Sequence, residues 1–520
     1  MRTFRWSPQW TIAVVVVTAV AAAVTIPLSL PDEPDATVSG LPDHAVPPSI
    51  LETVRLSSPH GLDGLTATLD GEPLRLRREG AALRPEVVAL PEGVHVLVVT
   101  PPPGTFGESE QTEITFRVDA TPPRLDIRPV EPVERGEAGE IRGTASGAVR
   151  VSAAGEETRP AADGSFTLPV RAGAGTVTVV AHDEAGNATT EDVAVTLRHP
   201  GMKAVHLTAS AWASSALREP VLDLVREGRI DTVQLDIKDE TGQIGYASQV
   251  PLAQEIGATT ELYDARAALD LLHEEGVHVV GRLVAFRDPI LGRASWESGD
   301  DQRVIQTTGG SPWSGGYGDY SFTNFADPEV REYNIALAEE AAQLGFDDIL
   351  YDYVRRPDGD VSAMVIPGLT TTPEEAIASF LAESRTAVHR HGAFQGASVY
   401  GIAASRPEQI AQDIPAMSEH VDYVAPMVYP SHWGPGEYGV ADPERQPYDI
   451  TARSLADFQR IARENGRTRV IPWLQAFSLG VEYGPGEIRA QIEAAADNGI
   501  DSFLLWNAGC RYDPRALPPT

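Results

Sequence analysis

Hydrophobic and polar positions alternate in two different ways along the chain. From about residue 50 to residue 197 the apolar runs are short and strand-like, as at residues 94–100 and 176–183. Turn residues separate these runs about every 8–12 positions, which is typical of antiparallel β-sandwiches. After Pro200, strand-like runs alternate with longer amphipathic stretches. The pattern therefore predicts one or two small all-β modules followed by an α/β domain.

The α/β part contains eight strand-like apolar runs. They lie at residues 204–208, 232–238, 277–284, 348–354, 395–400, 423–429, 469–474 and 502–507. Helical patterns lie between them, for example at residues 262–275, 328–344 and 485–498. Eight such repeats favour a (β/α)8 barrel over a doubly wound sheet, and no G-x-G-x-x-G follows the first strand. Catalytic groups are then expected at the carboxyl ends of the strands.

The N-terminal thirty residues have the composition of an export segment. Arg2 and Arg5 precede an uncharged, mostly apolar stretch at residues 11–30. This stretch is long enough to remain as a single membrane anchor, although cleavage as a signal peptide is also open. Residues 31–48 are rich in Pro, Asp and Glu and are expected to form a linker. The protein is therefore expected outside the cytoplasm, either anchored or secreted.

Charge and cysteine content exclude several classes of function. The 41 Lys and Arg residues are outnumbered by 74 Asp and Glu residues, which gives a formal charge of −33. This balance argues against a nucleic-acid partner. The single Cys510 excludes an intramolecular disulfide and any multi-cysteine metal site. No cofactor or metal motif is found, so neither is expected, although calcium at the acidic residues 236–240 is left open. Oligomeric state is not indicated.

Polar residues inside the predicted strands are the candidates for chemistry. In residues 233–239 the two-residue period places Gln234, Asp236 and Lys238 on the lumen side of the barrel. The same reasoning places Asp352 inward near the end of the fourth strand. A buried carboxylate is costly unless it is paired or functional, and Arg282 is one of its expected partners.

Several motifs resemble a family of exported bacterial TIM-barrel proteins classed as glycoside hydrolases. The matching stretches are residues 235–242, 281–289, 351–357, 417–432, 472–477 and 505–507. The resemblance implies a TIM barrel that hydrolyses glycosidic bonds, with Asp352 at the place of the nucleophile of α-amylase-type and α-galactosidase-type barrels. One departure is Ser398, where the family pattern has an Asp in the fifth strand. Residues 181–189 and 118–123 also resemble bacterial immunoglobulin-like domains and their joints.

Glycoside hydrolysis requires two carboxyl groups, and Asp352 is expected to be the first. The candidates for the second are Asp239 and Glu240, followed by Asp236. Aromatic, basic and amide side chains near the strand ends are expected to bind sugar. These are Lys238, Arg282, Tyr353, Arg355, Tyr429, His432, Trp433, Trp473, Gln475, Trp506 and Asn507. The irregular segment 288–326 is expected to form a lid.

Together these observations predict five regions and one function. The regions are a signal anchor or signal peptide (1–30), a linker (31–48), a β-sandwich-like module (49–119), an immunoglobulin-like module (120–199) and a TIM barrel (200–520). The expected function is hydrolysis of a polysaccharide outside the cytoplasm by two carboxylates. The alternative is a barrel that binds cell-wall or extracellular glycan without hydrolysing it.

Overall fold

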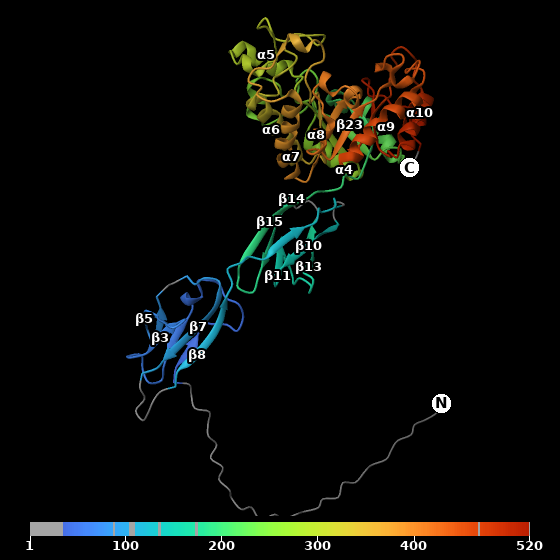
Figure 1. Ribbon diagram of the computed structural model, residues 1–520. Coiled ribbons are helices and arrows are strands. Elements are labelled where there is room, and N and C mark those ends of the chain that lie inside the picture. The colour runs from blue at the N-terminus through green and yellow to red at the C-terminus, as the bar shows by residue number, and fades with distance from the viewer. Residues whose placement is uncertain are drawn as a thin grey trace, which may run out of the picture. The chain divides into compact units, whose positions relative to one another are not determined.

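The computed structural model describes residues 35–86, 89–102, 110–133, 137–171, 175–465 and 468–518 (Figure 1). The predicted export segment lies outside these residues. Among the helices that the structure does describe, none is long and apolar enough to cross a membrane. The chain divides into two compact units, of which the first is centred on residues 35–124 and the second contains the barrel. Each is described by itself.

The first unit consists of two antiparallel four-stranded sheets. One has the strand order β1-β2-β6-β5 and the other the order β4-β3-β7-β8. The strands are β1 (Thr37–Ser39), β2 (Arg55–Ser57), β3 (Thr66–Leu69), β4 (Glu72–Pro73), β5 (Leu76–Glu79), β6 (Ala82–Pro85), β7 (Gly93–Thr100) and β8 (Thr112–Val118). Alternate side chains of β7 and β8, among them Leu97, Val99 and Phe116, are buried in one hydrophobic core. The two-residue alternation of apolar and polar positions therefore reflects sheets with one buried face and one exposed face.

The next segment is also all-β and antiparallel. Its sheets have the orders β13-β10-β9 and β12-β11-β14-β15. The strands are β9 (Arg124–Ile127), β10 (Ala138–Ser146), β11 (Arg150–Ala153), β12 (Glu156–Thr158), β13 (Ser165–Arg171), β14 (Gly175–His182) and β15 (Ala188–Val195). The antiparallel sheets confirm the all-β expectation, whereas the immunoglobulin-like assignment stays a prediction.

A closed parallel barrel follows, as the eight apolar runs predict. Its strand order is β22-β20-β18-β17-β16-β26-β25-β23-β24, and pairing of β22 with β23 closes the ring. The strands are β16 (Lys203–Leu207), β17 (Thr232–Lys238), β18 (His278–Val284), β20 (Asp348–Asp352), β22 (Phe394–Tyr400), β23 (Tyr423–Met427), β24 (Arg469–Val470), β25 (Trp473–Gln475) and β26 (Phe503–Trp506). The seventh predicted run contains both β24 and β25, which are separated by Ile471 and Pro472. The barrel prediction is confirmed.

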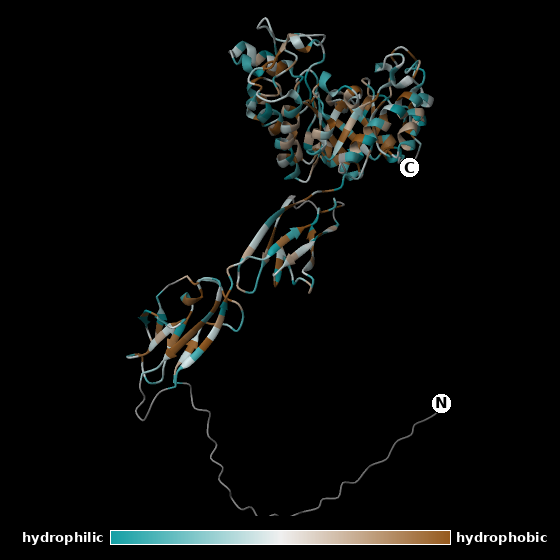
Figure 2. Cartoon of the chain, viewed as in Figure 1, coloured by the Kyte–Doolittle hydropathy of each residue, from teal (hydrophilic) through white to brown (hydrophobic). Residues whose placement is uncertain are grey.

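Helices surround the barrel, and their ends follow from local sequence. They are α1 (Ala209–Ala213), α2 (Ser215–Arg226), α3 (Pro251–Glu255), α4 (Ala265–Glu274), α5 (Pro289–Ser298), α6 (Pro328–Leu344), α7 (Pro373–His389), α8 (Ile414–Ser418), α9 (Pro447–Asn465) and α10 (Pro485–Asp497). Asp327 caps α6 by accepting from two backbone N–H groups, and Gly345 ends it at a φ of 113°. Hydropathy colouring shows apolar segments on strands of the barrel and also on strands of the first unit (Figure 2).

The segment 288–326 is more ordered than its sequence suggested. It begins with helix α5, capped by Asp288, and continues into the short strand β19 (Gln306–Thr307). Strand β19 pairs with β21 (Met364–Val365) in the segment after β20. The lack of a clear periodicity in the sequence concealed α5, which buries only Leu291, Gly292 and Ser295.

A bulge in β17 corrects the predicted orientation of Lys238. The pairing of β17 with β18 shifts register between Asp236 and Lys238, so the strict two-residue alternation ends at Asp236. Lys238 is fully buried, and its Nζ donates to Asp288 at 2.7 Å and to Asn334 of α6 at 2.9 Å. The side chain therefore lies on the helix side of the sheet and not in the lumen.

The end of the barrel where the strands begin holds a buried carboxylate between two histidines. Asp348, at the start of β20, is fully buried and lies 2.8 Å from His199 Nε2 and 2.6 Å from His278 Nε2. Burial favours the neutral carboxyl, but the two imidazoles outweigh it and lower the pKa of Asp348. The backbone N–H of Gly201 donates to His199 Nδ1 at 3.0 Å, so the ring proton is on Nε2. A metal requires a lone pair at that nitrogen, so the cluster does not fit a metal ion.

We expect Asp348→Asn to lower the free energy of unfolding by about 3 kcal/mol, because an amide N–H₂ would face a histidine N–H in a buried site. Urea unfolding followed by tryptophan fluorescence measures this, since every described tryptophan lies in the barrel. Asp270→Asn, at an exposed position of α4, is the control, with an expected change below about 0.5 kcal/mol. Equal effects of the two substitutions would contradict the structural role of Asp348.

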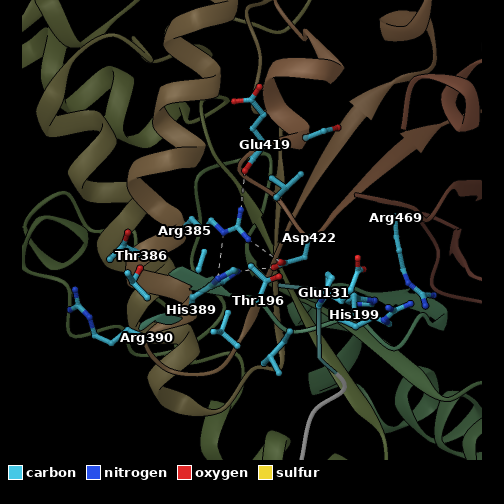
Figure 3. Close-up of a pocket in the computed structure, with 18 residues that line it drawn as sticks. Glu131, Thr196, His199, Arg385, Thr386, His389, Arg390, Glu419, Asp422 and Arg469 are labelled. Atoms are coloured by element: carbon cyan, nitrogen blue, oxygen red, sulfur yellow. Dashed lines mark hydrogen bonds and ion pairs between the residues drawn. The ribbon is translucent and has the colours of Figure 1, made fainter. Parts of the chain in front are cut away.

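A second ionic contact lies at this end of the barrel. Figure 3 shows Arg385 and His389, both on α7, directed toward Asp422, which precedes β23. His389 Nε2 lies 2.8 Å from Asp422 Oδ2, and the backbone N–H of Gln395 donates to the same oxygen at 2.7 Å. The contacts join a helix to two strands at the amino ends of the strands, where TIM barrels carry stabilising residues.

Candidate active site

A cavity of about 380 Å³ opens at the carboxyl ends of the barrel strands. One wall is ionic and the other is aromatic and apolar. The lining residues are Glu240, Arg282, Asp352, Tyr353, Tyr400, Gly401, Ile402, Met427, Tyr429, His432, Trp433, Trp473 and Trp506. The position is the one where TIM barrels carry their chemistry.

Arg282, on β18, binds three carboxylates at once. Its Nε and Nη2 donate to Asp352 Oδ2 at 2.9 and 2.6 Å, and its Nη1 donates to Asp236 Oδ1 at 3.1 Å. The Nη2 group also donates to Glu240 Oε1. Arg282 is 1% exposed, so these are buried, charge-assisted hydrogen bonds. The structure thus brings together three of the four predicted catalytic acids.

Asp352 ends β20 in a fixed orientation. Its Oδ1 accepts from the backbone N–H of Tyr353 at 2.7 Å, while Oδ2 accepts from Arg282. Tyr353 has a φ of 48°, which a non-glycine residue rarely adopts. This turn directs the Tyr353 ring into the cavity lining beside the carboxylate. Such strained residues cluster at functional sites.

The two neighbouring acids Asp239 and Glu240 lie in different environments. Asp239 Oδ1 accepts from Thr241 and Gln243 within its own turn, and burial raises the pKa of Asp239. Glu240 instead lines the cavity. Burial opposes its ionisation, but Arg282 outweighs this effect and lowers the pKa of Glu240 to about 2. Of these two acids, only Glu240 therefore reaches the cavity.

Asp236 is linked to a buried histidine of β16. His206 Nε2 lies 3.0 Å from Asp236 Oδ1, and neither residue is more than 2% exposed. The His206 ring stacks on Trp506 with 4.2 Å between ring centroids. Burial alone would lower the pKa of His206, but Asp236 raises it to about 9. Asp236 is absent from the cavity lining and lies behind Arg282.

The aromatic wall comes from the last strands, as predicted. Tyr429, His432, Trp473 and Trp506 all line the cavity. Burial lowers the pKa of His432, which favours the neutral imidazole. Trp473 Nε1 donates to Ser398 Oγ at 3.0 Å, so the residue that departs from the family pattern supports an aromatic ring.

The remaining predicted binding residues lie behind the cavity surface. Lys238 bonds to α6, as described above. Gln475 accepts from the Ser431 N–H at 3.0 Å, and Asn507 donates to the Ala476 carbonyl, so both position loops. Arg355 is 2% exposed and donates to hydroxyl groups of two tyrosines. It borders a small side chamber of about 30 Å³ next to Asp352.

Four lining residues were not predicted from the sequence: Tyr400, Gly401, Ile402 and Met427. The first three end β22 and begin the 3₁₀ helix η4 (Gly401–Ala404), and Met427 ends β23. Their position at strand ends was a usable signal, but they carry no charge or indole ring to mark them. A Cβ at Gly401 would lie only 2.8 Å from the Trp433 ring, so a larger residue than glycine would clash at this position.

We expect Arg282→Gln to lower the free energy of unfolding by about 3 kcal/mol at pH 7, because three carboxylates lose their common cation. The folded pKa of Glu240, about 2, lies below its ordinary value of 4.5, so its contribution is present above pH 4.5 and is lost as the pH falls toward 2. The deficit of the variant should therefore shrink below about pH 4.5. Urea unfolding at pH 7 and pH 4 tests this, and an unchanged deficit would contradict the ionic role of Arg282.

Comparison with known proteins finds several similar solved structures. Among curated proteins, none matches the chain. The solved structures similar to it include a hypothetical protein from Ruminiclostridium thermocellum, at 30% identity over 37% of this chain and 96% of that chain, with a TM-score of 0.34. The PgaB (BpsB) glycoside hydrolase domain from Bordetella bronchiseptica is 15% identical over 60% and 95%, with a TM-score of 0.45. An α-galactosidase from Thermus thermophilus is 15% identical over 86% and 95%, with a TM-score of 0.39.

The family comparison covers nearly the whole barrel. The model of the family described as "Putative glycosyl hydrolase domain" matches residues 204–512, which is more than half of the chain. This range includes β16 and extends beyond β26. The chain therefore belongs to the family of putative glycosyl hydrolase domains.

Proposed function

We propose that this protein hydrolyses glycosidic bonds of a polysaccharide outside the cytoplasm, with Asp352 and Glu240 as the two carboxylates. The observation that carries the proposal is the convergence of both acids on Arg282 beside an aromatic cavity. A sugar ring stacks on indole and phenol faces, while its hydroxyls bond to the ionic wall. The extracytoplasmic location rests on the composition of residues 1–30.

The spacing of the acids favours retention of configuration. Both Asp352 and Glu240 accept from Arg282 Nη2, so ordinary hydrogen-bond lengths place their nearest oxygens within about 6 Å. Retaining glycosidases separate their carboxyl groups by about 5–5.5 Å, and inverting ones by about 6.5–9.5 Å. In the ligand-free site the two acids are therefore closer to the separation of retaining enzymes than to that of inverting ones.

The different settings of the two acids suggest their roles. Asp352, fixed by the Tyr353 N–H and Arg282, attacks the anomeric carbon as the glycosidic C–O bond breaks. Glu240, whose side chain is 29% exposed, leaves Arg282 when the glycan binds. Burial under the sugar then raises its pKa, so it takes up a proton and passes it to the leaving oxygen. In the second step it removes a proton from the attacking water, and Asp352 is released.

A second candidate function has two observations in its favour. In the ligand-free cluster both cavity-lining acids are bonded to Arg282, an arrangement that also suits a rigid binding surface. Ser398 stands where the resemblance implies an Asp, and it accepts from Trp473. A barrel that binds glycan without hydrolysis is consistent with both features.

Reducing-end release from a panel of bacterial cell-wall and capsular polysaccharides separates the two functions. The chain from residue 36 onward is assayed for release and, in parallel, for binding by sedimentation with the insoluble glycans. Release of new reducing ends supports the hydrolase. Binding without release favours the glycan-binding barrel, and the absence of both would contradict a role on these glycans.

A further inference from the structure

The buried cluster around Arg282 contains more negative than positive charge. Arg282 donates to Asp236, Asp352 and Glu240, which are three carboxylates for one guanidinium. Asp236 and Asp352 are at most 3% exposed, so water does little to offset the imbalance. An uncompensated buried charge is costly, and a further cation is therefore expected close to the cluster.

His206 occupies the position for that cation. It is fully buried, and its Nε2 contacts the same Asp236 oxygen that accepts from Arg282. Asp236 overcomes the opposing effect of burial and raises the pKa of His206 to about 9. At neutral pH the imidazole is therefore protonated, and Asp236 lies between two cations.

Few other ionisable groups face His206. The hydroxyl of Tyr512 donates to the backbone carbonyl of His206 at 2.8 Å and stays neutral, because burial raises its pKa. The thiol of Cys510 accepts from the Thr208 N–H at 3.5 Å; burial opposes its ionisation, but His206 lowers its pKa. Glu240 and Arg282 lie on the far side of Asp236 and interact with His206 only through their charges. Trp473 and Trp506 cover the remaining ring faces.

We propose that His206 is a positioning residue that neutralises Asp236 and so sets the proton affinity of the hydrolytic pair. With Asp236 balanced, Arg282 supplies one charge to two carboxylates, Glu240 and Asp352. The pair then keeps one net negative charge and binds one proton when glycan enters, which leaves one acid and one carboxylate. The inference rests on the proposed function, since it explains how the two acids divide their roles.

Two substitutions should affect the pH profile of hydrolysis differently. His206→Gln removes a positive charge, which raises both pKa values of the pair and shifts the profile of kcat/KM alkaline by about one pH unit. Asp236→Asn removes a negative charge, but the buried His206 then loses the carboxylate that keeps it protonated and becomes neutral, so the net charge and the profile stay close to those of the parent. The double variant also lacks both charges, so its profile should match that of Asp236→Asn. A purely structural role would lower activity without the alkaline shift of His206→Gln.

The pH profiles are measured by reducing-end release from the polysaccharide of the panel that the parent hydrolyses fastest. An alkaline shift in His206→Gln that is absent from Asp236→Asn and from the double variant supports the proposal. An equal shift in all three variants, or loss of activity in His206→Gln at an unchanged pH optimum, would overturn it.

A titration that needs no substrate separates this inference from the proposed function. In the parent chain labelled with [13C]histidine, the resonance that disappears in His206→Gln should report a charged imidazole up to at least pH 8. A His206 that is neutral at pH 7 would overturn the inference even if the parent hydrolyses glycan. A charged His206 in a parent without hydrolysis would contradict the proposed function and leave the charge assignment intact.

Discussion

Replacement of Asp352 by Asn is expected to lower kcat for glycan release by at least about 10³-fold, while the dissociation constant for the glycan stays within about threefold. The amide is not nucleophilic, and its N–H₂ cannot accept from the Tyr353 N–H as Asp352 Oδ1 does. The aromatic wall and Glu240 remain in place, so binding is retained. Initial rates of reducing-end release and equilibrium binding on the same polysaccharide measure the two quantities.

Asp360→Asn is the matched control for this experiment. Asp360 follows the same strand, but its carboxylate is exposed and accepts only from Ser362 in a local turn. Its substitution should change kcat by less than about twofold. Release by Asp352→Asn within tenfold of the parent would exclude Asp352 as the nucleophile. Loss of both release and binding, with a lower unfolding free energy, would instead indicate a structural role.

The barrel was predictable because each strand carries its own signal. The apolar run at residues 232–238 coincides with β17, and the helix pattern at residues 328–344 coincides with α6. Asp327, which caps α6, shows that the boundary of this helix has a local cause. Pairing order also followed, because sequential parallel strands joined by helices close in only one way.

The orientation of side chains was less predictable than the strands themselves. Asp236 and Asp352 point inward as alternation requires, but the bulge after Asp236 turns Lys238 to the helix side. A bulge depends on pairing with the neighbouring strand and leaves no mark in the strand's own sequence. The partners that stabilise Lys238 are Asp288 and Asn334, which lie 50 and 96 residues away.

The candidate site was found in outline, while its electrostatics required three dimensions. The sequence identified Asp352, Glu240 and Arg282 as candidates but did not rank Glu240 above Asp239. Their ranking depends on which carboxylate reaches Arg282, and that is decided by the turn in which Asp239 accepts from Thr241. The link between His206 and Asp236 joins two different strands, so it is visible only in three dimensions.

The two neighbouring acids after β17 should differ sharply when each is replaced by its amide. We expect Glu240→Gln to lower kcat on polysaccharide by about 10²–10⁴-fold, since it removes the proton donor to the leaving oxygen. Asp239→Asn should change kcat by less than about threefold and cost about 1 kcal/mol of stability, because it disturbs hydrogen bonds within a turn. The two residues are adjacent and both changes turn a carboxylate into an amide, so each variant is a control for the other. Initial rates measure the change in kcat, and urea unfolding measures the change in stability.

An aryl glycoside of the sugar that the panel identifies tests the assigned role of Glu240 further. A nitrophenolate leaves without protonation, so Glu240→Gln should lose much less activity on this substrate than on polysaccharide, whereas Asp352→Asn should lose activity on both. Equal losses of Glu240→Gln on the two substrates would contradict its role as the acid. A large loss in Asp239→Asn with Glu240→Gln active would transfer that role to Asp239. Asp239 could act as the acid only if the turn at residues 239–243 opened when glycan binds, because in the ligand-free protein that turn holds Asp239 away from the cavity.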